Sequence, residues 1–271
     1  MSLICSVRRT RPRPASNGMA RKTIIVANWK MHPRARAEAK AMLSATKKIA
    51  ERAPGAAIIV APPSIYLSEL PGTSSGKKIQ FAAQHAHAGD IGAYTGEISM
   101  AQVKDAKARY VLVGHAERRA AGESDEDTRM QVASALLYGL TPIICVGERE
   151  RNSRGEHLLF IRAQLRAAFT DVADTMVQKC IVAYEPIWAI GASEAMPPRQ
   201  MHEMAIFIRK TIHELRGERG QDLKVLYGGA VDDSNARSML SEGDVAGLLV
   251  GRASTNAEEF AALIRAITTK K

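Results

Sequence analysis

Short apolar runs alternate with longer amphipathic stretches along the chain from Thr23 onward. The apolar runs lie at residues 23–27, 57–61, 79–83, 110–113, 141–146, 180–184, 224–227 and 247–250. Stretches with helical spacing of apolar residues follow them at 34–53, 64–70, 99–108, 124–139, 156–169, 198–215, 234–241 and 256–267. Short, continuous apolar runs are typical of strands covered on both faces. The pattern predicts eight strand–helix units, with Ser124 as the N-cap of the fourth long helix.

Strands that alternate with helices predict right-handed crossovers and a parallel sheet. Eight such units in about 250 residues fit a closed (β/α)₈ TIM barrel, and we expect residues 23–271 to form it as one domain. A doubly wound open sheet is the alternative. It is disfavoured because no GxGxxG motif follows the first strand.

The composition is that of an ordinary globular protein, with 46% hydrophobic and 24% charged residues. No apolar run approaches the roughly 20 residues that a membrane span requires, so no membrane association is expected. The three cysteines form no CxxC pair, which argues against a disulfide framework and a structural zinc site. A reducing cytoplasm is the expected location.

The net charge of +10 is concentrated partly in the first residues of the chain. Residues 1–22 are rich in Arg, Pro and Ser, and we expect a disordered basic extension that is either a transit-like segment or an over-extended start before Met19. Subtracting the four arginines of residues 1–18 leaves +6, spread among mixed-sign helices. No basic stretch carries interspersed aromatic residues, so nucleic-acid binding is not expected.

The ends of the predicted strands carry the candidate chemistry, because a barrel of this type has its active site at the carboxyl ends of its strands. "ANWK" places Asn28 and Lys30 after the first strand, and "GHAERR" places His115 and Glu117 after the fourth. Glu185 follows the sixth strand in "AYEPIWAIG", and the glycine-bearing turns "YGGAV" and "VGR" follow the last two. A carboxylate, a histidine, a lysine and exposed backbone N–H groups together suit a phosphorylated carbonyl substrate.

Six motifs in this order, "NWK", "GAYTGEIS", "GHAERR", "CVGE", "AYEPIWAIG" and "YGGAV", resemble the triosephosphate isomerase family from Thr23 to about Ile267. In that family the surroundings of the catalytic glutamate and histidine set their pKa values for proton transfer. The resemblance implies an aldose–ketose isomerase of glycolysis and gluconeogenesis that interconverts dihydroxyacetone phosphate and D-glyceraldehyde 3-phosphate without cofactor or metal.

The resemblance also implies a role for each matching residue. Glu185 is the base that moves a proton between adjacent carbons, and His115 is the neutral group that stabilises the enediolate. Lys30 supplies positive charge, Asn28 a hydrogen bond, and Glu117 support. It implies that backbone N–H groups bind the substrate phosphate at Gly191, Ala230, Gly251 and Arg252. It implies a lid from Pro186 to about Met196. It also implies a homodimer in which Thr95 enters the partner's site.

Five positions depart from the family pattern. Ala116 and Ala230 replace serines, Ser193 replaces the second glycine of the lid, Arg252 replaces a glycine and His85 replaces an asparagine. Two lost hydroxyls weaken binding or rate by one or two decades at about 0.5–1.5 kcal/mol per hydrogen bond. The catalytic groups are intact while the phosphate site is altered, so a tetrulose phosphate stays an alternative substrate.

Two further readings stand beside catalysis. The chain is alternatively a catalytically silent barrel that binds or scaffolds a partner, although the presence of Asn28, Lys30, His115, Glu117 and Glu185 argues against it. His85 and His87 in "HAH" have a spacing compatible with a metal site, but the sequence places no carboxylate support beside them.

Overall fold

The chain forms a closed parallel barrel. The computed structural model describes residues 22–73, 79–189 and 195–268. Adjacent strands pair in chain order, and the eighth closes on the first. The strands are β1 (Thr23–Asn28), β2 (Ala56–Ala61), β3 (Ile79–Ala83), β4 (Tyr110–Val113), β5 (Thr141–Val146), β6 (Ile181–Tyr184), β7 (Lys224–Tyr227) and β8 (Gly247–Val250). The predicted (β/α)₈ fold is confirmed.

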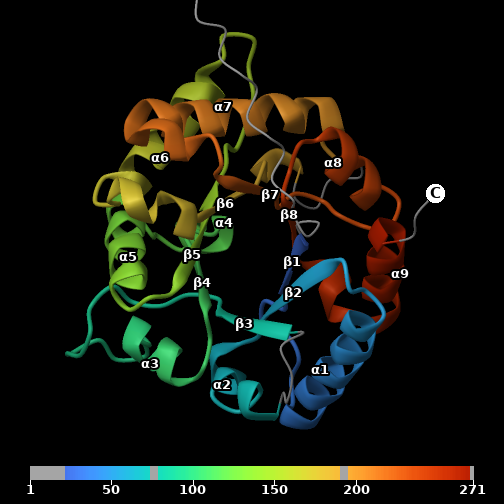
Figure 1. Cartoon of the computed structure of the whole chain (residues 1–271). Coiled ribbons are helices and arrows are strands. Elements are labelled where there is room, and N and C mark those ends of the chain that lie inside the picture. The colour runs from blue at the N-terminus through green and yellow to red at the C-terminus, as the bar shows by residue number, and fades with distance from the viewer. Residues whose placement is uncertain (1–21, 74–78, 190–194, 269–271) are drawn as a thin grey trace, which may run out of the picture.

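Helices ring the barrel on the outside (Figure 1). They are α1 (Arg36–Glu51), α2 (Ser64–Leu67), α3 (Met100–Asp105), α4 (Ala116–Ala120), α5 (Asp125–Leu137), α6 (Glu156–Phe169), α7 (Pro198–Arg216), α8 (Ala236–Glu242) and α9 (Ala257–Thr268). Short 3₁₀ helices are η1 (Pro71–Thr73), η2 (Asp174–Lys179), η3 (Ile187–Ala189), η4 (Gly217–Gly220) and η5 (Arg252–Thr255). Helix α4 was not predicted, because five residues are too few to show helical periodicity.

Successive strand residues serve two separate cores, which explains why the strands are apolar throughout. Val26 packs inside the barrel, whereas its neighbours Ile25 and Ala27 pack outward against the helices. The barrel interior is filled by buried side chains that include Val26, Ile59, Leu112, Ile143, Leu226 and Leu249. Because both faces are dry, polar side chains are confined to the strand ends, and the carboxyl ends collect those with chemical function.

No helix within the described ranges is long and apolar enough to cross a membrane.

Ser124 caps helix α5, as the sequence predicts. Its hydroxyl accepts a hydrogen bond from the Asp127 N–H at 3.1 Å, and the Asp127 carboxylate accepts one from the Ser124 N–H at 2.9 Å. The hydrogen bonds from Ser124, hydroxyl first and backbone second, lower the pKa of Asp127. Their stabilisation is therefore present above about pH 4 and is lost as acid protonates the carboxyl.

Replacing Ser124→Ala is expected to lower the free energy of unfolding by about 1 kcal/mol, because the capping hydrogen bonds are lost. Urea unfolding at pH 7 measures the change. Ser68→Ala is the matched control, since Ser68 is exposed and caps no helix N-terminus. Equal stability of the two variants would show that this cap contributes nothing.

Candidate active site

Glu185 and His115 form the buried centre of the barrel mouth. Glu185 directly follows β6 and is 2% exposed, and His115 follows β4 by two residues and is 8% exposed. One Glu185 carboxylate oxygen, Oε1, lies 3.3 Å from His115 Nε2. The other, Oε2, accepts a hydrogen bond from the Ala116 N–H at 3.1 Å. Ala116 has no hydroxyl to offer, and its backbone N–H holds the carboxylate instead.

A glycine permits this placement of Glu185. The Glu185 N–H donates to the Val146 carbonyl at 2.8 Å, which ties the end of β6 to the end of β5. A Cβ on Gly147 would stand 1.8 Å from the Glu185 carbonyl oxygen. Only glycine therefore lets the two strand ends approach so closely.

The hydrogen bonds of His115 define which ring nitrogen carries its proton. Its Nδ1 accepts the Glu117 N–H at 3.2 Å at the start of α4, so in the neutral ring the proton is on Nε2. Asn28 Nδ2 lies 3.4 Å from this Nε2, while Asn28 Oδ1 accepts the Lys30 N–H. Two N–H donors therefore converge beside Glu185, and together they can bind one oxygen atom of a ligand.

Lys30 is held in a strained conformation at the same mouth. Its φ of 51° lies in the left-handed region, which is uncommon for a residue other than glycine. Its N–H donates to Asn28 Oδ1 at 3.0 Å, and its carbonyl accepts from Gln84 Nε2 at 2.8 Å. Its ammonium group pairs with Glu117 at 2.5 Å, where Glu117 is largely exposed. The ammonium group stands at the barrel mouth, 3.8 Å from where a Cβ on Gly251 would lie.

Residues after β7 and β8 line the other side of the mouth. A Cβ on Gly228 would come within 2.9 Å of Glu185 Cγ, and one on Gly251 within 3.2 Å of Lys30 Cε. The N–H groups of Ala230 and Arg252 have no hydrogen-bond partner among the described residues. These groups are available to an anion. The Arg252 side chain is exposed and likewise has no ion-pair partner in the described part of the chain.

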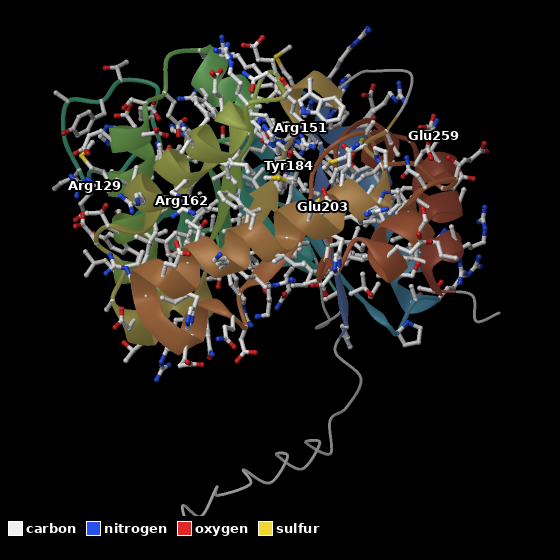
Figure 2. The ribbon with its side chains drawn as sticks, turned by 90° about the horizontal axis from the view of Figure 1, so that it is seen from above. Arg129, Arg151, Arg162, Tyr184, Glu203 and Glu259 are labelled. Atoms are coloured by element: carbon white, nitrogen blue, oxygen red, sulfur yellow. The ribbon has the colours of Figure 1, made fainter. Side chains whose placement is uncertain are left out.

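A buried carboxylate that sequence reasoning left without a role supports the start of the predicted lid. Glu148, 2% exposed, accepts hydrogen bonds from the Tyr184 hydroxyl at 2.7 Å, the Trp188 Nε1–H at 2.9 Å and Arg151 Nε–H at 2.8 Å. Figure 2 shows Arg151 and Tyr184 together at one end of the barrel. Burial, and then the charge of Glu148, raise the pKa of Tyr184, so its phenol stays protonated and donates. The "CVGE" motif was the available signal for Glu148.

Three of the predicted residues are not brought into this cluster within the described chain. Gly191 and Ser193 lie outside the described residues. Thr95 is exposed in the segment between β3 and α3.

A cavity of about 1160 Å³ opens at the opposite end of the barrel, lined by the strand starts and α7, and contains none of the predicted catalytic residues.

The two cysteines of the described barrel are buried thiols without a disulfide. Burial, and then the charge of Glu185, raise the pKa of Cys145, and burial raises the pKa of Cys180 to about 12. Because the thiolate is the reactive species, neither should be alkylated by iodoacetamide at pH 8 in the folded protein, and both should be alkylated in guanidinium. Peptide mass spectrometry measures this. If either cysteine of the folded protein were alkylated as fast as the thiol of free glutathione, the expectation would be wrong.

Comparisons with known proteins identify the family of the chain. The family model for triosephosphate isomerase matches residues 23–267. The triosephosphate isomerase of Xylella fastidiosa strain M12 is 40% identical over 248 residues, covering 91% of this chain and 99% of that protein. That of Herminiimonas arsenicoxydans is 36% identical with the same coverage, and that of Caldanaerobacter subterraneus is 37% identical over 90% of this chain and 99% of its own. The chain belongs to the triosephosphate isomerase family.

Proposed function

We propose that this enzyme interconverts dihydroxyacetone phosphate and D-glyceraldehyde 3-phosphate, with Glu185 as the base. The observation that carries the proposal is the contact between Glu185 and His115, with the Asn28 amide directed to the same point. A carboxylate beside two converging donors can remove a carbon-bound proton while the adjacent carbonyl oxygen is stabilised. The family membership of the chain and its named relatives support the same reaction.

The proton transfers follow from these positions. Glu185 takes a proton from the carbon beside the carbonyl, and the electron pair of that C–H bond forms the enediolate double bond. The Nε2–H of His115 and the amide of Asn28 donate to the oxygen that gains negative charge. Glu185 then returns the proton to the neighbouring carbon, while the hydroxyl proton moves from one enediolate oxygen to the other, so that the oxygen losing its proton becomes the new carbonyl. The reaction moves protons and one double bond, so its balance needs no redox partner.

Lys30 and the turns after β7 and β8 are proposed to bind the substrate's phosphate side. The ammonium of Lys30 offsets negative charge, and Glu117, its ion-pair partner, orients it. The free N–H groups of Ala230 and Arg252, together with Gly251, are proposed to donate to the phosphate oxygens. Gly191 is proposed to do the same from the lid, which closes over the intermediate and excludes water.

We propose that two copies of the chain form a homodimer. Large apolar side chains are exposed after three consecutive strands: Met31 (92%) after β1, Ile65 (77%) after β2 and Ile91 (89%) after β3. These three residues follow adjacent strands on the same end of the barrel, and large apolar side chains exposed together are typical of an interaction surface, which supports the proposal. Thr95 lies in the same segment as Ile91 and is proposed to enter the partner's site.

The cellular setting follows from the proposed reaction. We propose a place in glycolysis and gluconeogenesis and a cytoplasmic location, to which the unpaired cysteines are suited. The barrel from residue 23 is proposed to be the catalytic unit, with residues 1–22 dispensable.

The test is kcat/KM of a chain that starts at Met19, measured on D-glyceraldehyde 3-phosphate and on L-erythrulose phosphate. A clear preference for the triose supports the proposal. A preference for the tetrulose would assign Ala230, Ser193 and Arg252 to a different specificity, and inactivity on both would favour the silent barrel. Glu185→Gln purified in parallel detects contaminating host isomerase.

A further inference from the structure

His85 lies where three segments of the chain meet. Its Nε2 is 2.8 Å from Glu97 Oε2 and 3.3 Å from an Arg118 guanidinium nitrogen, and its Nδ1 is 3.7 Å from Glu123 Oε2. Glu97 belongs to the segment 85–98 between β3 and α3, Arg118 to α4, and Glu123 to the link between α4 and α5. The sequence places no carboxylate near this histidine, and the fold brings two.

His85 Nε2 lies between Glu97 of its own segment and Arg118 of α4, and it can hydrogen-bond only one of them at a time, so the ring joins the two segments as a contact between an acidic and a basic group. Arg118 donates to Glu123 Oε2 at 3.2 Å, and the Gly114 N–H at the end of β4 donates to Glu123 Oε1 at 3.2 Å. The imidazole of His85 is therefore fastened, through Arg118 and Glu123, to the strand end that precedes His115.

His87, two residues further on, holds the segment only to itself. Its N–H donates to the Ile98 carbonyl at 2.8 Å, its Nδ1 accepts the Gly89 N–H at 2.9 Å, and its ring stacks on Tyr94 with centroids 4.0 Å apart. Within the described residues it makes no hydrogen bond to α4. The two histidines thus differ in what they connect.

Helix α4 is the element through which the site is assembled. His115 is its N-cap, the Ala116 N–H holds the Glu185 carboxylate, and Glu117 pairs with Lys30. A displacement of α4 therefore moves three contacts of the site at once.

We propose that His85 is a positioning residue that couples the 85–98 segment, which carries Thr95, to helix α4 and so keeps the dimer loop and the catalytic groups in register. The functional half of this inference rests on the proposed isomerase and its homodimer. The coupling itself concerns two segments of one chain and is measurable on its own.

The charged groups around His85 are the carboxylates of Glu97 and Glu123 and the guanidinium of Arg118. The charges of His87 and His85 also lower the pKa of Asp127 on α5, after the larger contributions from Ser124. The ring of His85 therefore stands between oppositely charged groups of the 85–98 segment, α4 and the link to α5.

The experiment is amide hydrogen exchange of the full chain and its His85→Ala, His85→Asn and His87→Ala variants, with kcat/KM on D-glyceraldehyde 3-phosphate measured in parallel. His85→Ala is expected to raise exchange about tenfold in both the 85–98 segment and α4, as loss of a charge-assisted hydrogen bond predicts, and to lower kcat/KM. His87→Ala is the matched control, and is expected to raise exchange in the 85–98 segment alone.

The Asn variant separates positioning from packing. Its amide can donate to Glu97 although the ring is lost, so we expect it to restore part of the exchange protection and of the kcat/KM that His85→Ala loses. Unchanged α4 exchange in His85→Ala, or a His85→Asn variant no better protected than His85→Ala, overturns the inference. An inactive natural chain with the expected exchange pattern would instead refute the proposed isomerase and leave the coupling standing.

Discussion

Glu185→Asp is expected to lower kcat at least about a hundredfold while the barrel stays folded, because the shortened side chain withdraws the carboxylate by about 1.5 Å from the reacting carbon. In the natural chain Glu185 is anchored at both carboxylate oxygens, by His115 Nε2 and by the Ala116 N–H. An aspartate cannot keep these two contacts and also reach the substrate. KM should change far less, since the base contributes mainly to the transition state.

Steady-state kinetics with the triose phosphates measures this prediction, and the thermal midpoint shows whether the variant is folded. Glu185→Gln keeps the length of the side chain and removes its basicity, so it should be at least as impaired as the aspartate variant. A Glu185→Asp enzyme with a rate within threefold of the natural one would remove Glu185 from its proposed role.

Lys30→Met is expected to lower kcat/KM by about 10²–10³-fold, the cost typical of removing one preorganised group that stabilises charge in the transition state. Methionine keeps the unbranched aliphatic stem and loses the ammonium that pairs with Glu117. Glu117 is 61% exposed, so water can solvate it when its partner is gone, and the fold should survive. We expect the loss of kcat/KM to be as large at low salt as at high salt with every substrate, and added chloride should not restore the activity.

Lys107→Met is the matched control for this change. Lys107 is a second lysine with a positive φ, 66°, and its side chain is 76% exposed just before the start of β4, at the end of the barrel away from the site. The control therefore repeats the same substitution in the same unusual backbone conformation. Equal activity losses in the two variants would show that the effect of Lys30→Met comes from the backbone and not from the missing charge.

The proposed phosphate side of the site is where this chain differs most from the pattern that its motifs resemble. The N–H groups of Ala230 and Arg252 make no hydrogen bond within the described residues, so the proposed backbone binding of an anion would not depend on the lost hydroxyl. Arg252 adds an exposed side chain next to Gly251, where an added Cβ would come within 3.2 Å of Lys30 Cε. Comparing kcat/KM on the triose phosphate and on the tetrulose phosphate measures the effect of these differences on specificity.

The sequence by itself determined the element order and the residues at the strand ends. Eight apolar runs predicted eight strands, and the C-terminal limits of β1 to β8 agree with the predicted runs to within one residue. The signal is strong because each strand is buried on both faces, so local composition reports the burial directly. For the same reason Asn28, His115 and Glu185 could be selected as the polar residues that follow such runs.

Only the tertiary structure decided how these residues meet. Several features depend on contacts that the sequence pattern does not show. They are the proton position on His115, the left-handed backbone of Lys30, the carboxylates around His85, and the donors that hydrogen-bond Glu148. Such contacts are set by the closing of the barrel and by side-chain packing at distances of a few ångströms, which leave no periodic trace in the sequence. Helix α4 shows the limit most plainly: it is too short for a pattern, yet it holds the site together.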